Sequence, residues 1–89
     1  MRDERRIERI LKAVANKRRL AILSYLSTSD RASVGDIAEK IGLSFKSTSR
    51  HLSILSGAEI LEREQESTTA WYRLEKPLSP VVKVLLTIL

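Results

Sequence analysis

The residues that could do chemistry are concentrated between Ser44 and Ser56, where several hydroxyl groups accompany two long cations. On a helix with about 100° between residues, Thr48, Leu52 and Leu55 share one stripe that must face the core. The polar side chains opposite that stripe and at its borders are Lys46, Ser47, Ser49, Arg50, His51 and Ser53. Arginine can donate two hydrogen bonds to guanine, and small hydroxyls let a helix backbone approach the bases. The pattern predicts a helix that lies in the major groove of DNA.

The alternative for this helix is an ordinary solvated face. Residues 46–58 contain no acid, whereas exposed helices usually mix both signs of charge so that side chains four apart can pair. This asymmetry favours the DNA-binding interpretation. Phe45 is left open: its angle places it near the core stripe, but a ring this early in the helix could point outward, where it could meet a thymine methyl.

Catalytic and metal-binding chemistry have few candidates. The chain has no Cys and a single His, so disulfides and thiolate metal sites are excluded. Ser47 and His51 are four residues apart, but no G-x-S-x-G motif is present and nothing marks an acid to orient the imidazole. The three Gly residues form no phosphate-binding loop. We expect no enzyme activity, no cofactor and no metal.

Length and charge are consistent with a small DNA-binding domain. A chain of 89 residues is expected to form one domain over 1–89, and its formal net charge of +5 favours a polyanionic partner. Half of the 16 basic residues lie in the first 19 positions, where phosphate contact and a solvated face are equally plausible. The N-terminus lacks the apolar run of a secretory signal, and the longest apolar stretch, 81–89, is too short to span a bilayer. We expect a cytoplasmic protein that does not bind membranes.

The apolar periodicity and the capping residues predict five helices and a hairpin. Ser33 and Asp36 have the spacing of a capping box, Gly42 suits a left-handed C-cap, Ser44 caps the next helix, and Gly57 is placed to end it. The predicted helices cover residues 5–15, 17–26, 34–41, 45–56 and 80–89, and the strands cover residues 60–66 and 70–74. This order is an α+β fold, a winged helix-turn-helix that is mostly helical with a two-stranded β-hairpin wing. Glu62, Glu64 and Glu66 make the wing acidic, and we expect it to contribute little to phosphate binding or to repel phosphate.

The last predicted helix is apolar nearly all round, with only Lys83 and Thr87 as a polar strip. A helix exposed on one side needs a much narrower apolar face, so this one is expected to pair with the first helix of a second copy. The residues predicted for that dimer interface are Ile7, Ile10, Leu11, Val14, Val81, Val82, Val84, Leu85 and Ile88.

Several short segments in this order resemble the ArsR-type winged-helix transcription regulators. The similar segments are Leu11–Leu23, Val34–Ser44, Ser49-Arg50-His51-Leu52 followed by Leu55, and Trp71-Tyr72-Arg73-Leu74. The resemblance implies a homodimer that reads an inverted-repeat operator in double-stranded DNA and usually represses transcription. Carried over by position, the DNA-binding residues are Ser47, Ser49, Arg50 and His51, with Lys46 as a neighbour. Arg63, one of the two cations of the wing, is also expected to contact DNA.

The sequence departs from that family in two informative places. Metal-sensing members carry a Cys pair at the third helix or Asp and His ligands on the last helix, and residues 32–36 and 81–89 have neither Cys nor His. Metal sensing is therefore not carried over. The family's Gly after the reading helix falls on Glu59, and Gly57 is expected to serve in its place.

Two functions remain open at this level. The first is a dimeric, sequence-specific DNA-binding regulator in which Arg50 reads a base. The second is a winged-helix module that docks a protein partner through its apolar last helix, an alternative supported by the acidic wing and the missing effector site. Retention on heparin or duplex DNA at low salt distinguishes them.

Overall fold

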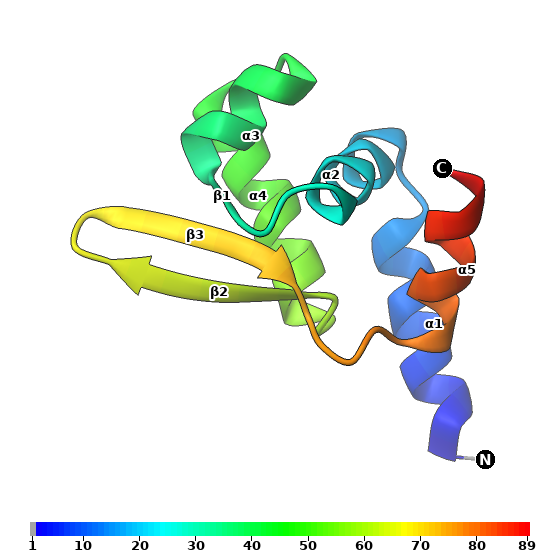
Figure 1. Cartoon of the computed structure of the whole chain (residues 1–89). Helices are drawn as coiled ribbons and strands as arrows, with labels where there is room; N and C mark the ends of the chain where they lie inside the picture. The colour runs from blue at the N-terminus through cyan, green and yellow to red at the C-terminus, as the bar shows by residue number, and fades with distance from the viewer. Residues whose placement is uncertain (1) are drawn as a thin grey trace.

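Five helices and a small sheet make up the fold in the computed structural model, which describes residues 2–89 (Figure 1). The helices are α1 (Arg2–Val14), α2 (Lys17–Ser27), α3 (Val34–Ile41), α4 (Phe45–Gly57) and α5 (Pro80–Ile88). The strands are β1 (Ala32–Ser33), β2 (Leu61–Glu66) and β3 (Thr69–Leu74). The predicted α+β winged helix-turn-helix is confirmed, with α3 and α4 as its helix-turn-helix pair and the β2–β3 hairpin as its wing.

The wing is part of a three-stranded antiparallel sheet in the order β1-β3-β2, so the predicted two-stranded wing was incomplete. Strands β2 and β3 pair from Leu61 opposite Leu74 to Glu66 opposite Thr69. Strand β1 adds two pairs, one of which joins Ser33 to Trp71. Strand β1 is only two residues long, too short to show an alternating pattern in the sequence. Its pairing partners on β3 lie about forty positions away, so no local signal predicts the pairing.

Local capping signals are confirmed. The Ser33 hydroxyl accepts a hydrogen bond from the Asp36 amide at 3.1 Å, and the Asp36 carboxylate accepts one from the Ser33 amide at 3.4 Å. Asn16, Ser44 and Ser79 likewise cap α2, α4 and α5. Each cap satisfies amides that the first helical turn leaves without a partner.

The corner after α4 differs from the prediction. Gly57 is an ordinary helical residue, and Glu59 instead takes the left-handed conformation with φ 61°. The Ile60 amide donates a hydrogen bond to the Leu55 carbonyl at 3.0 Å, and the Glu59 amide donates one to the Ser56 carbonyl at 3.0 Å. These two hydrogen bonds form a Schellman motif. Gly57 therefore does not replace the family's Gly: a side-chain-bearing residue holds that conformation.

One apolar core connects the helices to the base of the wing. Its most deeply buried members come from α2, α3, α4, β2 and α5 and are Ile22, Leu23, Ile37, Leu52, Leu55, Leu61 and Val82. Helices α1 and α5 lie side by side at one end of the molecule, and the wing extends from the other (Figure 1). The core thus fixes α4 by its buried stripe and leaves its opposite face open.

Candidate nucleic-acid interface

Helix α4 has the two faces that its sequence predicts. Thr48, Leu52 and Leu55 are completely buried, whereas Lys46 and Arg50 are exposed. Among residues 2–89, neither Lys46 nor Arg50 forms an ion pair. Both cations therefore remain available to an external anion.

His51 is held at the border of this face by Arg19 of α2. The Arg19 Nη1 lies 3.2 Å from Nδ1 of His51, and because a guanidinium can only donate, Nδ1 is the acceptor. The proton of the neutral ring is then on Nε2. Burial lowers the pKa of His51, and the positive charges of Arg19, Arg18 and Arg50 lower it further. The imidazole is consequently neutral at pH 7 and can donate from Nε2.

Two of the basic residues in the first 19 positions, here called the N-terminal cluster, make hydrogen bonds to the backbone of other helices. Arg9 donates to the Gly57 carbonyl at the end of α4 and lies 3.9 Å from the Glu59 carboxylate. Arg18 donates to the Ile41 carbonyl at 3.3 Å, next to the turn between α3 and α4. These contacts orient α4 relative to α1 and α2, so these two cations help to position the candidate interface.

The wing presents different residues to its two sides, because side chains alternate along a strand. Arg63 and Gln65 of β2 face α4, and the Arg63 guanidinium donates to the Gln65 side chain at 2.6 Å. Between α4 and the wing lies a groove of about 590 Å³, here called the wing groove. Its lining includes Phe45, Ser49, Ser53, Arg63, Gln65 and Tyr72.

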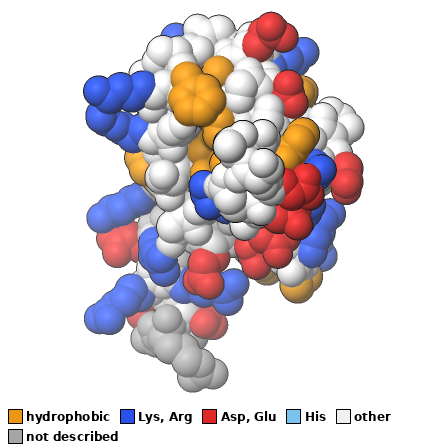
Figure 2. Space-filling model, turned by 90° about the vertical axis from the view of Figure 1, so that its left-hand side faces the viewer, with side chains coloured by type: hydrophobic (Ala, Val, Ile, Leu, Met, Phe, Trp, Pro, Cys, Tyr) orange, Lys and Arg blue, Asp and Glu red, His pale blue; other side chains and the backbone are white. Residues whose placement is uncertain are grey.

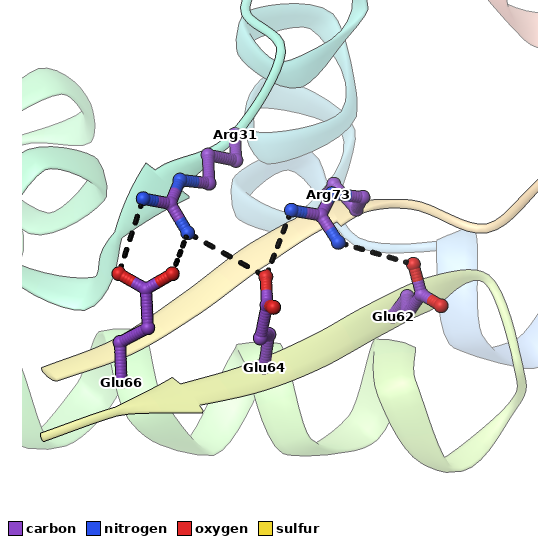
Figure 3. A network of polar contacts seen from close by, with 5 residues as sticks. All are labelled: Arg31, Glu62, Glu64, Glu66 and Arg73. Atoms are coloured by element: carbon purple, nitrogen blue, oxygen red, sulfur yellow. Dashed lines mark hydrogen bonds and ion pairs between the residues drawn. The ribbon is translucent and has the colours of Figure 1, made fainter.

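The acidic residues of the wing lie on its other side, where two arginines bind them (Figure 3). Arg31 makes a two-point contact with Glu66, at 2.9 and 3.3 Å. Arg73 donates to Glu64 at 2.9 Å and to Glu62 at 3.4 Å. The hydrogen bond from Arg31 lowers the pKa of Glu66. The carboxylates point away from α4 and are partly neutralised, which weakens the predicted repulsion between wing and phosphate.

Arg31 is the residue that the sequence prediction missed. Its guanidinium stacks over the Trp71 ring at 4.0 Å from the ring centre while it holds Glu66. No pattern in the sequence pointed to Arg31, because it lies in the loop before β1, 35 positions from Glu66. Figure 2, seen from the tip of the wing, shows the largest group of acidic side chains to the right of centre with basic ones beside it, and further basic side chains along the left edge.

Exposed apolar side chains also mark α1 and α5. Ile7 and Leu11 are 44% and 49% exposed, and Val84 and Ile88 are 62% and 74% exposed. The remaining residues predicted for a dimer interface are less exposed to solvent. Ile10, Val14 and Val82 are buried in the chain's own core, and Val81 and Leu85 are half-buried against it. Helical periodicity does not distinguish burial in the chain's own core from burial by a partner, so the interface list remains a prediction, of which Ile7, Leu11, Val84 and Ile88 are the most exposed members.

Neither a metal cluster nor a membrane span is found in the described part of the chain. Residues 2–89 contain no group of three or more His, Cys, Asp or Glu side chains that could hold a metal ion. None of their helices combines the length and the apolar character needed to cross a bilayer.

Comparison with known proteins adds a family and several relatives. Residues 16–63 match the model of the bacterial regulatory protein, arsR family. The chain is 37% identical over 68 residues to the HTH-type transcriptional regulator Rv0324 of Mycobacterium tuberculosis, which covers 76% of this chain and 30% of that protein. It is 35% identical over 80 residues to the transcriptional activator HlyU of Vibrio cholerae, which covers 90% of this chain and 70% of that protein.

A solved structure gives the same fold. The homodimeric winged helix-turn-helix DNA-binding domain Mb0332 from Mycobacterium bovis, described as a possible ArsR-family regulator, superposes with a TM-score of 0.81. It is 29% identical to this chain, and the match covers 93% of this chain and 74% of that one. These relatives are described as regulators and not as enzymes.

Proposed function

The chain belongs to the ArsR family of bacterial regulatory proteins, and on that premise we propose that it acts as a homodimeric repressor at an inverted-repeat operator. The family consists of DNA-binding transcription regulators, so no catalytic activity is expected. In the proposed complex, α4 of each copy lies in a major groove. A bound dimer would occlude the DNA that it covers, which is the simplest route to repression for a domain of this size.

The observation that carries this proposal is the open, acid-free face of α4. We assign base recognition to Arg50, whose guanidinium can donate two hydrogen bonds to guanine O6 and N7. Lys46 lies one turn earlier on the same face and is assigned to a phosphate or a base. Ser47, Ser49 and His51 are assigned to the sugar-phosphate backbone, which fixes the register of the helix without reading sequence. Arg63 faces the same side from the wing and is assigned to a neighbouring phosphate.

Dimerisation is proposed through α1 and α5. The exposed side chains of Ile7, Leu11, Val84 and Ile88 would leave water on pairing with their copies across a two-fold axis. The Mycobacterium bovis domain is described as homodimeric, which supports a dimer but does not identify its interface. Such a dimer would place its two α4 helices about 34 Å apart, one turn of DNA, which matches an inverted repeat.

Selection of bound sequences from a random duplex pool tests the DNA part of the proposal. We expect an inverted repeat with half-sites one helical turn apart and an affinity that falls steeply with salt, because phosphate contacts release counterions. Recovery of no enriched sequence, together with indifference to heparin, would refute it and favour a protein-docking module.

Sedimentation tests the dimer separately. We expect the wild type to sediment as a dimer and Val84→Glu as a folded monomer, since Val84 is exposed and its replacement disturbs no core contact. Thr87→Glu adds the same charge to the polar strip of α5 and serves as the matched control. A wild type that stays monomeric at micromolar concentration contradicts this part.

A further inference from the structure

We propose that Phe45 is a specificity-determining residue that packs its ring against the methyl group of a thymine in the major groove. This inference rests on the proposed function and extends it to a residue that neither the family match nor the relatives assign. The recognised group is the C5-methyl, the one apolar group on the major-groove edges of unmodified base pairs.

The first support is the position of the ring in solvent. Phe45 is 64% exposed, although its side chain is strongly apolar. It is absent from the described core cluster and from the residues packed against it. The ring therefore contributes little to folding in the free protein, and its burial on binding would be favourable by the hydrophobic effect.

The second support is the place of Phe45 on α4. It is the first residue of the helix, directly after the cap Ser44, whose hydroxyl accepts from the Ser47 amide at 3.1 Å. In helix-turn-helix proteins the N-terminal residues of the reading helix contact the base edges. The cap fixes the backbone of Phe45, and with it the direction in which the side chain leaves the helix.

The third support is the arrangement of neighbouring side chains. Residues four apart share a helix face, so Phe45 heads a stripe with Ser49 and Ser53, and all three line the wing groove. Lys46 and Arg50 form a parallel stripe of cations beside it. One stripe offers an apolar ring and small hydroxyls, and the other offers charge.

The charge around the ring favours DNA over a second protein as its partner. An apolar ring at the edge of an acid-free, cationic face suits a polyanion that also carries an apolar group. A T·A pair in a duplex combines both, because its methyl lies in the groove between phosphates. A purely apolar partner would have to bury Lys46 and Arg50 without compensation.

Replacement of thymine by deoxyuracil tests the inference, because it removes only the methyl. On the duplex selected by the wild type, each thymine of a half-site is replaced in turn and the Kd is measured. We expect a loss of about fourfold at one thymine near the N-terminus of α4, the value for burial of one methyl group. Phe45→Ala should bind the parent duplex less tightly by a similar factor and lose its sensitivity to uracil at that position.

Two further variants make the result specific. Ile54→Ala removes another exposed apolar side chain of α4, which is 41% exposed, and should keep the full response to uracil. Phe45→Leu should retain part of it. The inference is overturned if the wild type responds to no uracil, or if Phe45→Ala responds as the wild type does. Absence of any selected duplex would instead refute the proposed function.

Discussion

The guanidinium of Arg19 on α2 lies 3.2 Å from Nδ1 of His51 on α4, and the same side chain donates from Nε to the Ala13 carbonyl of α1 at 2.5 Å. One arginine thereby links three helices and fixes the imidazole in a single orientation. Since Nδ1 accepts, the Nε2–H of His51 is left to donate, which is the form a backbone phosphate requires.

Loss of Arg19 should destabilise the fold and release the imidazole. We expect Arg19→Ala to lower the free energy of unfolding by about 1–3 kcal/mol, because it removes hydrogen bonds from a charged donor. The ¹⁵N shifts of His51, the only His of the chain, should change from one tautomer to a mixture. Lys17→Ala, an exposed cation of the same helix, is the control and should change neither measurement. An unaltered tautomer in Arg19→Ala would contradict the assigned hydrogen bond.

Stability should depend on pH through His51. Burial and the neighbouring arginines lower its pKa below the usual value, so the unfolded chain binds the proton more readily than the folded one. The contribution of His51 to the free energy of unfolding should therefore be constant above about pH 7.5, fall as the pH drops from 6.5 towards the folded pKa, and level off below it, where both states bind the proton. Urea titrations at pH 7.5, 6.5 and 5.5 measure this slope. His51→Gln should remove it, and an equal slope in that variant would assign the effect to other groups.

Arg50 and Lys46 should contribute to DNA binding in different ways. Arg50→Ala should lower operator affinity by about 1–3 kcal/mol and relax the preference at one base pair. If Lys46 binds a phosphate, Lys46→Ala should weaken binding to all sequences equally and reduce the salt slope by about 1. Fluorescence anisotropy on matched and mismatched duplexes separates the two. Lys76→Ala, an exposed cation beyond the wing, should leave both quantities unchanged.

Glu59 should be replaceable with a gain in stability. Its φ of 61° is a conformation that a residue with Cβ adopts at a cost and that Gly adopts freely. We expect Glu59→Gly to raise the free energy of unfolding by about 0.5–1 kcal/mol. Glu59→Ala removes the same carboxylate near Arg9 but keeps the strain, and it should show no gain. If both variants change the free energy of unfolding equally, the cause is the lost ion pair between Glu59 and Arg9 and not the backbone conformation.

Thr48 is fully buried, and within residues 2–89 its hydroxyl has no hydrogen-bond partner. Thr48→Val keeps the shape and a similar helix propensity while it removes the unsatisfied group, so it should stabilise the fold by about 1 kcal/mol. Thermal and urea denaturation measure this change. Thr68→Val, at the exposed turn of the wing, is the matched control. A loss of stability in Thr48→Val would indicate that the hydroxyl has a partner after all.

The sequence by itself determined the local elements and the character of α4. Ser33 with Asp36 and Gly42 define both ends of α3 through contacts within a few residues, so composition and spacing suffice. The buried stripe of Thr48, Leu52 and Leu55 follows from the helical period alone. Because that stripe faces the core, the polar side of α4 must face solvent, which is why the position of the candidate site could be predicted from the sequence.

Only the tertiary structure decided which distant residues meet. Arg19 reaches His51 across 32 positions and Arg31 reaches Glu66 across 35, and no periodic pattern links residues so far apart. The same holds for burial: Ile10 and Ile7 lie on one apolar stripe of α1, yet the first is 5% exposed and the second 44%. A period shows that a face is apolar, whereas the packing of the other helices decides how much of it the chain covers itself.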